Sequence, residues 1–184
     1  MKLTTAQLMR AVPQTNRLRA EEFVGVFNEW ASRFGIDTPL RVAHFLAQCW
    51  QESGCLRYLE EIASGKAYEW RKDLGNVQKG DGVRFKGRGI IQITGRANYQ
   101  AYAKSGFCVG DLMSHPEWLA QSPGCYKSAL WFWWKSNLSE LADTDNGHNS
   151  GEVCRRITRK VNGGINGLAQ RQYYMRKFRK ELGL

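Results

Sequence analysis

The stretch TPLRVAHFLAQCWQESG, residues 38–54, gives the clearest structural signal in the chain. Threonine followed by proline is a typical helix start, because the fixed φ of proline suits the first helical position, where its missing N–H would be unpaired anyway. Apolar residues then recur at helical spacing, and Gly54 is a typical stop. We expect a helix over about 39–53, with a buried stripe of Val42, Phe45, Leu46, Cys49 and Trp50.

Helical patterns also dominate the rest of the 184 residues. Residues 90–94 form one short β-prone run, in which Gln92 and Thr94 share a face. The segment 64–89 is polar and glycine-rich, which predicts a long structured loop. Further helices are expected over about 23–34, 96–104, 123–141, 150–161 and 168–182, and the aromatic residues of 123–141 predict a central, buried helix. The expected fold is a single, mainly α domain over 1–184 with a small β element.

The composition limits the possible partners. Lys and Arg outnumber Asp and Glu by 27 to 17, and the net charge of +10 favours nucleic acid, an anionic membrane surface or an acidic polymer. No run approaches the roughly 18 apolar residues of a membrane span, so we expect no stable membrane insertion. The first seven residues lack the apolar core of a signal peptide.

The five cysteines predict reduced, mostly buried thiols. They form no C-x-x-C pair and are not accompanied by histidines at ligand spacing. This argues against a disulfide framework and against a zinc site. We therefore expect neither a metal nor another cofactor.

Carboxylates are the best candidates for catalysis, because the P-loop, G-x-S-x-G and H-E-x-x-H patterns are all absent. Glu52 lies in the last turn of the helix expected over 39–53, at the border of its apolar stripe. The negative end of the helix dipole and partial burial both disfavour an ionised carboxylate there, as a general acid requires. By spacing alone, a solvated glutamate at a helix end is the commoner meaning.

A second carboxylate follows nine positions later, at Glu61, beyond a glycine. The intervening chain can leave the helix and return across a cleft. Hydrolysis with inversion needs two carboxyl groups roughly 6.5–9.5 Å apart, with a water between them. Glu60 and Glu69 are alternatives for this second position.

Three motifs resemble glycoside hydrolase family 19, which contains chitinases and phage endolysins. HFLAQCWQESGCLRYLEE at 44–61 resembles the catalytic helix of that family and the E-E that follows it. FKGRGIIQITGRANY at 85–99 is similar to its [FY]-x-G-R-G-x-[IL]-Q-[IL]-[ST] segment and the following N-Y. ITRKVNGG at 157–164 resembles its I-T-x-x-[IV]-N-G-G helix end. The three occur in the order of the family.

The resemblance implies a lysozyme-like, two-lobed helical fold with a substrate cleft, and an inverting mechanism. Glu52 would protonate the glycosidic oxygen, Glu61 would activate a water as the base, and Thr94 with Asn98 would hold that water. The residues that we expect to bind the sugar are Gln92, Asn98, Tyr99, Asn162 and Arg171. Two positions depart from the family pattern: Gln51 replaces the usual histidine before the acid, and Cys55 replaces the second glycine after it.

Charge favours peptidoglycan over chitin as the polymer. Peptidoglycan carries peptide carboxylates, whereas chitin is nearly uncharged, so a net charge of +10 assists approach only to the former. We therefore expect a monomeric endolysin, made in the host cytoplasm without a signal peptide and acting on the cell wall after release. A chitinase, a non-catalytic wall-binding module and a nucleic-acid binder are the alternatives. No recognised nucleic-acid motif supports the last of these.

Overall fold

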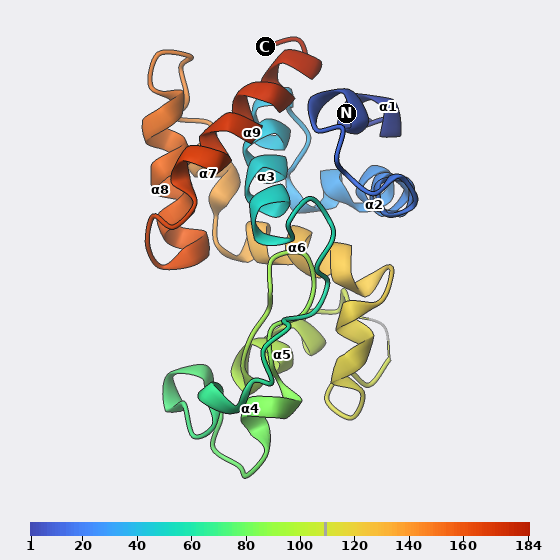
Figure 1. The fold of residues 1–184 in the computed structure, drawn as a ribbon, viewed down its shortest axis with the longest axis vertical. Helices are drawn as coiled ribbons and strands as arrows, with labels where there is room; N and C mark the ends of the chain where they lie inside the picture. The colour runs from blue at the N-terminus through green and yellow to red at the C-terminus, as the bar shows by residue number, and fades with distance from the viewer. Residues whose placement is uncertain (109) are drawn as a thin grey trace.

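A computed structural model describes residues 1–108 and 110–184. Figure 1 shows α1, α2, α3, α8 and α9 gathered at one end of the molecule, α4 and α5 at the other, and α6 between them. In chain order the elements are α1 (Thr5–Ala11), α2 (Arg17–Trp30), η1 (Ala31–Phe34), α3 (Pro39–Glu52), η2 (Lys66–Tyr68), η3 (Lys72–Leu74), α4 (Asp81–Arg84), α5 (Arg96–Ala103), η4 (Pro116–Ala120), α6 (Gly124–Lys135), α7 (Leu138–Ala142), α8 (Ser150–Asn162) and α9 (Leu168–Glu181). The mainly α fold is confirmed.

Helix α3 is the centre of the core. Thr38 caps it through a hydrogen bond from the Arg41 amide, and Pro39 occupies its first turn, as the sequence predicts. Every residue from 42 to 50 is buried, so the helix is covered on all sides and not only along its apolar stripe. Its aromatic side chains pack edge-on against other helices. The ring centroid of Phe45 lies 5.5 Å from that of Trp133 in α6, and the ring centroid of Trp50 lies 5.1 Å from that of Phe178 in α9.

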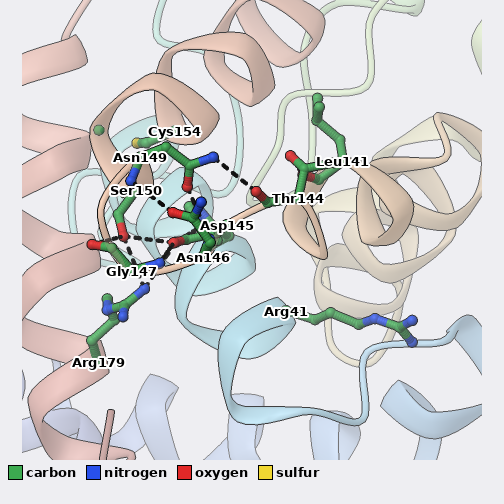
Figure 2. Close-up of polar contacts among 12 residues, drawn as sticks. Arg41, Leu141, Thr144, Asp145, Asn146, Gly147, Asn149, Ser150, Cys154 and Arg179 are labelled. Carbon is green, nitrogen blue, oxygen red and sulfur yellow. Dashed lines mark hydrogen bonds and ion pairs between the residues drawn. The ribbon is translucent and has the colours of Figure 1, made fainter.

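A buried carboxylate ties α3 to both C-terminal helices. Asp145, in the connection before α8, lies 2.8 Å from Nε2 of His44 in α3. It also accepts a 2.8 Å hydrogen bond from Arg179 of α9 (Figure 2). Its other oxygen accepts from Ser150 and from the amide of Gly147. The start of α8 is thereby fixed to α3 and α9.

Two expected elements differ in the structure. The helix expected over 123–141 is divided into α6 and α7, because Asn137 adopts a left-handed backbone conformation with φ of 50°. The side chain of Trp134, in the last turn of α6, is half exposed and not buried. Residues 90–94 form a tight turn, not a strand: Arg88 and Ile93 exchange backbone hydrogen bonds, and Gln92 has φ of 59°. The small β element consists of isolated bridges from Arg88 to Glu60 and to Ile93.

Within the described residues, none of the five cysteines is in a disulfide. No helix of this part of the chain is both long and apolar enough to cross a membrane.

Candidate active site

Glu52 is the last residue of α3, and its side chain is 17% exposed. A guanidinium nitrogen of Arg171 in α9 donates a hydrogen bond to its Oε1. The same arginine donates to Oε1 of Gln48 at 2.6 Å and to the carbonyl of Asn166 at 3.2 Å. The carboxylate is therefore oriented by a cation that a helix 119 residues further along the chain supplies.

Glu61 lies in the extended segment that follows α3. Its amide donates to the carbonyl of Gly87 at 2.9 Å, which fixes its backbone beside the 85–95 segment. The phenol of Tyr68 donates to Oε1 at 2.9 Å, and the amide of Gly87 donates to Oε2 at 3.2 Å. Both oxygens thus have a donor, while the side chain remains partly exposed. A carboxylate held in this way can accept a proton from a water that approaches its open side.

Three side chains converge on Gly87. A Cβ placed on this glycine would lie 2.6 Å from Oε1 of Gln92, 3.2 Å from Oγ1 of Thr94 and 3.3 Å from Oε2 of Glu61. The missing side chain of Gly87 therefore lets an amide, a hydroxyl and a carboxylate share one small region. Asn98 adjoins this group, because its Nδ2 donates to the carbonyl of Thr94 at 2.8 Å.

Comparison with known proteins adds the family. Residues 44–149 match the family described as chitinase class I, which is more than half of the chain. The chain belongs to glycoside hydrolase family 19. It is accordingly a chitinase-like glycoside hydrolase.

Relatives within family 19 come from bacteria and plants. A Haemophilus influenzae protein described as a glycosyl hydrolase family 19 domain-containing protein is 30% identical, covering 74% of this chain and 78% of that protein. An Arabidopsis thaliana endochitinase is 32% identical over 89% of this chain, which spans only 56% of the length of that enzyme.

Solved chitinase structures share the fold. Chitinase C from Streptomyces griseus HUT6037 has a TM-score of 0.68 at 22% identity, covering 98% of this chain and 92% of that one. A class IV chitinase from Zea mays has a TM-score of 0.59 at 21% identity, covering 100% of this chain and 83% of that one. The expected lysozyme-like fold is therefore confirmed.

The two alternative carboxylates have structural contacts. Glu60 accepts from Nε of Arg88 at 2.9 Å and lies 3.3 Å from the ammonium group of Lys86. Glu69 accepts from the amides of Gly80 and Gly82, at 2.6 and 2.8 Å, and so organises the turn into α4. Glu61 differs from both because the side chains of Thr94 and Gln92 lie around its carboxylate.

Two expected sugar-binding residues lie behind the site and not in it. Tyr99 is fully buried; its hydroxyl donates to the carbonyl of Lys86 at 2.8 Å and accepts from Arg88 at 3.0 Å. Arg171 is 2% exposed, and all three of its guanidinium nitrogens contact protein atoms. Their burial leaves almost no surface for a sugar in this conformation, so we expect both to position other residues.

Asn162 is exposed at the last position of α8. The connection that follows it reaches the neighbour of Glu52: a Cβ on Gly167 would lie 2.6 Å from Nε2 of Gln51. The connection after α8 therefore packs beside the end of α3.

Tyr68 and Gln48 are site residues to which the sequence motifs assign no role, and Gly87 belongs to the G-R-G motif without an expected contact to Glu61. Tyr68 and Gly87 belong to the irregular segment between α3 and α5, where no periodicity indicates which side chains meet. Gln48 precedes Glu52 by one helical turn, and that spacing alone predicts a shared face. Its contact with Arg171 depends on the packing of α9.

One mainly apolar cavity lies away from these carboxylates. It has a volume of about 220 Å³, and its walls include Tyr102, Phe107 and Trp118 between α5 and α6. None of the described residues that line it is acidic, so we place the candidate chemistry at Glu52 and Glu61. Within residues 1–108 and 110–184, no group of three or more His, Cys, Asp or Glu side chains is arranged to hold a metal.

Proposed function

We propose that this protein is an endolysin that hydrolyses β-1,4 glycosidic bonds of bacterial peptidoglycan by an inverting mechanism. The observation that carries the proposal is the convergence of Glu61, Thr94 and Gln92 on Gly87. A carboxylate with a hydroxyl and an amide beside it can bind a water and orient it for attack. Glu52, at the end of α3, then supplies the proton that the leaving oxygen needs.

In this mechanism the sugar chain lies between Glu52 and Glu61. Glu52 transfers its proton to the glycosidic oxygen, and Arg171 holds the carboxylate in place as negative charge develops on it. Glu61 removes a proton from the water, which attacks the anomeric carbon from the face opposite the leaving group. The amide of Gly87 and the phenol of Tyr68 keep Glu61 oriented during this transfer.

The preference for peptidoglycan rests on charge. A net charge of +10 is attracted to a polymer that bears peptide carboxylates, and it offers little advantage on nearly neutral chitin. The proposal includes synthesis in the host cytoplasm, release onto the cell wall and action as a monomer. Chitin hydrolysis is the alternative, favoured by the similarity to an Arabidopsis thaliana endochitinase.

Digestion of purified peptidoglycan and of chitin tests the substrate. Mass spectrometry of the new reducing ends identifies the bond that is cleaved. We expect muropeptide fragments from peptidoglycan at a rate well above that on chitin. Products from chitin alone would overturn the endolysin proposal and support the chitinase alternative.

The Glu52→Gln variant tests the acid. The amide keeps the shape of the side chain but has no proton to transfer, so lysis of outer-membrane-permeabilised cells should fall by at least ~100-fold. Circular dichroism should show an unchanged fold. Near-native lysis by the purified variant would contradict the assignment of Glu52 as the acid. Binding of the variant to isolated cell walls would then test whether the protein acts without catalysis.

The anomeric configuration of the first product tests the mechanism and the base. Inversion at a β-1,4 bond releases an α-anomer, which NMR detects before mutarotation. Glu61→Gln should abolish turnover, whereas Glu60→Gln and Glu69→Gln should retain most of it. Thr94→Val removes one hydrogen bond and should raise the barrier by about 1–3 kcal/mol. A β-anomer would overturn inversion; loss at Glu69 but not at Glu61 would move the base to Glu69.

A further inference from the structure

Positive charge is concentrated in the last two helices. Residues 150–184 contain nine Lys and Arg residues and two Asp and Glu residues, a net charge of +7 out of +10 for the whole chain. Helices α8 and α9 fill this segment and lie side by side in Figure 1. Most of the net charge of the protein therefore lies in this segment, although Arg171 is buried against Glu52 and Arg179 pairs with Asp145.

Helix α8 presents this charge in an ordered row. Its buried face consists of Val153, Cys154, Ile157 and Thr158. Arg156, Arg159 and Lys160 are exposed on the remaining face. Glu152 is the single acidic residue of α8. Both of its carboxylate oxygens already accept hydrogen bonds from Arg155, at 2.6 and 2.7 Å. In the part of the chain that the structure describes, Arg156, Arg159 and Lys160 form no salt bridge.

This row begins next to the acid. Arg159 and Lys160 lie within one helical turn of Asn162, and the connection after Asn162 contacts Gln51 beside Glu52. At its other end α8 is fixed through Asp145 to His44 of α3 and to Arg179 of α9 (Figure 2). The 13 residues of α8 extend about 20 Å, so the helix forms a rigid continuation of the site.

We propose that α8 is a contact surface for the part of an acidic glycan strand that extends beyond the cleft, with carboxylates of the polymer pairing with Arg156, Arg159 and Lys160. This inference rests on the proposed function. The arginine fork matches a carboxylate geometrically, but one exposed ion pair contributes little. Several such pairs formed at once contribute more than one pair. A row of cations should therefore bind a polymer with repeated acidic groups more tightly than a neutral polymer.

Binding without turnover tests the surface. In the full-length Glu52→Gln background, the triple substitution Arg156→Gln, Arg159→Gln, Lys160→Gln is compared with its parent by co-sedimentation with insoluble peptidoglycan and with chitin powder. At low salt we expect the affinity for peptidoglycan to fall about tenfold, and the affinity for chitin to stay the same. The difference should shrink above roughly 0.15 M salt, where the Debye length is near 8 Å.

A matched control separates position from total charge. The substitutions Lys2→Gln, Arg33→Gln and Lys104→Gln remove the same charge from exposed sites outside α8 and α9. This control should bind peptidoglycan within about twofold of the parent. An equal loss in both triple variants would overturn the proposal and leave only a net-charge effect, and no loss in the α8 variant would overturn it directly.

The chemistry of the partner is tested on the polymer itself. Peptidoglycan whose carboxyl groups have been converted to amides should bind the parent protein as weakly as untreated peptidoglycan binds the α8 variant. Binding to duplex DNA or to anionic vesicles that depends on α8, with no such dependence for peptidoglycan, would assign the surface to another partner. Because these assays need no catalysis, failure of the proposed reaction would appear in digestion experiments while the binding result remained separate.

Discussion

The phenol of Tyr68 donates a hydrogen bond of 2.9 Å to Oε1 of Glu61, seven residues earlier in the chain. The amide of Gly87 donates to the other oxygen, so the carboxylate has one donor on each side. Burial and the hydrogen bond with Glu61 raise the pKa of Tyr68. The phenol therefore remains a donor throughout the neutral range.

Removing this donor should slow turnover without unfolding the protein. Tyr68→Phe keeps the ring, and we expect kcat to fall about tenfold with little change in KM, since a hydrogen bond to a charged group contributes about 1.5–3 kcal/mol. A normal melting temperature with an unchanged kcat would exclude a positioning role for Tyr68.

Filling the space at Gly87 should disturb the site more than the fold. In Gly87→Ala the added methyl group would meet Gln92, Thr94 and Glu61 at 2.6–3.3 Å, so these side chains must shift. We expect kcat/KM to fall at least ~100-fold, because small displacements of catalytic groups have large effects on rate. Thermal unfolding should show a loss of stability below about 2 kcal/mol. Retention of full activity would mean that the convergence on Gly87 has no catalytic importance.

The turn after Glu52 should favour glycine over alanine at position 55. Cys55 and Leu56 have φ of 63° and 64°, and they follow Gly54 with φ of 56°. Left-handed conformations strain residues that have a Cβ by roughly 1–2 kcal/mol. Cys55→Gly and Cys55→Ala both lose the thiol contact with Tyr174. The difference between their free energies of unfolding therefore reports the backbone strain at position 55. Denaturant unfolding should find the glycine variant more stable, whereas the order in a helix is the reverse.

Acid should weaken the junction of α3, α8 and α9. Burial lowers the pKa of His44 from its ordinary value of 6.5. With Nε2–H donating to Asp145, protonation would place a hydrogen on Nδ1, which has no hydrogen-bond partner among the described residues. The folded state therefore binds fewer protons than the unfolded state, and the free energy of unfolding decreases as pH falls from 6.5 through the folded-state pKa.

Asp145 adds to this loss at lower pH. Burial opposes its ionisation, but hydrogen bonds from Ser150, Gly147 and His44 outweigh burial and lower the pKa of Asp145 below 3.8. Stability from these bonds is present above 3.8 and disappears as pH falls through the folded-state value. Urea unfolding at pH 7.5, 6.0 and 5.0 should show falling stability, and His44→Gln should flatten that trend. A wild-type stability that is constant over this range would contradict the prediction.

The sequence predicts elements with local signals well. Helix α3 is expected over 39–53 and observed over 39–52, because its cap, its proline and its apolar spacing all lie within the element. The 123–141 segment lacks such a signal at its break: Asn137 tolerates the left-handed conformation, but nothing in the aromatic pattern requires it there. At 90–94, burial of Ile90, Ile91 and Ile93 leaves no alternation between an inner and an outer face.

In the candidate site, too, local motifs predict some features, and others depend on tertiary packing. Motif resemblance identifies Glu52 and Glu61, and their catalytic roles remain predictions. The contacts of Arg171 with Glu52 and of Tyr68 with Glu61 depend on where separate segments pack. Local patterns carry no information about such packing. The burial of Tyr99 and Arg171 follows from it as well.

The link between Arg171 and Glu52 also sets an order of events during synthesis. A ribosome that has made 170 residues has made both glutamates, but not the cation that contacts Glu52. The nascent chain therefore carries an incompletely arranged acid until α9 has emerged and packed against α3. Proteolysis that removes α9 returns the protein to the same incomplete state, even though every residue from 44 to 164 is still present.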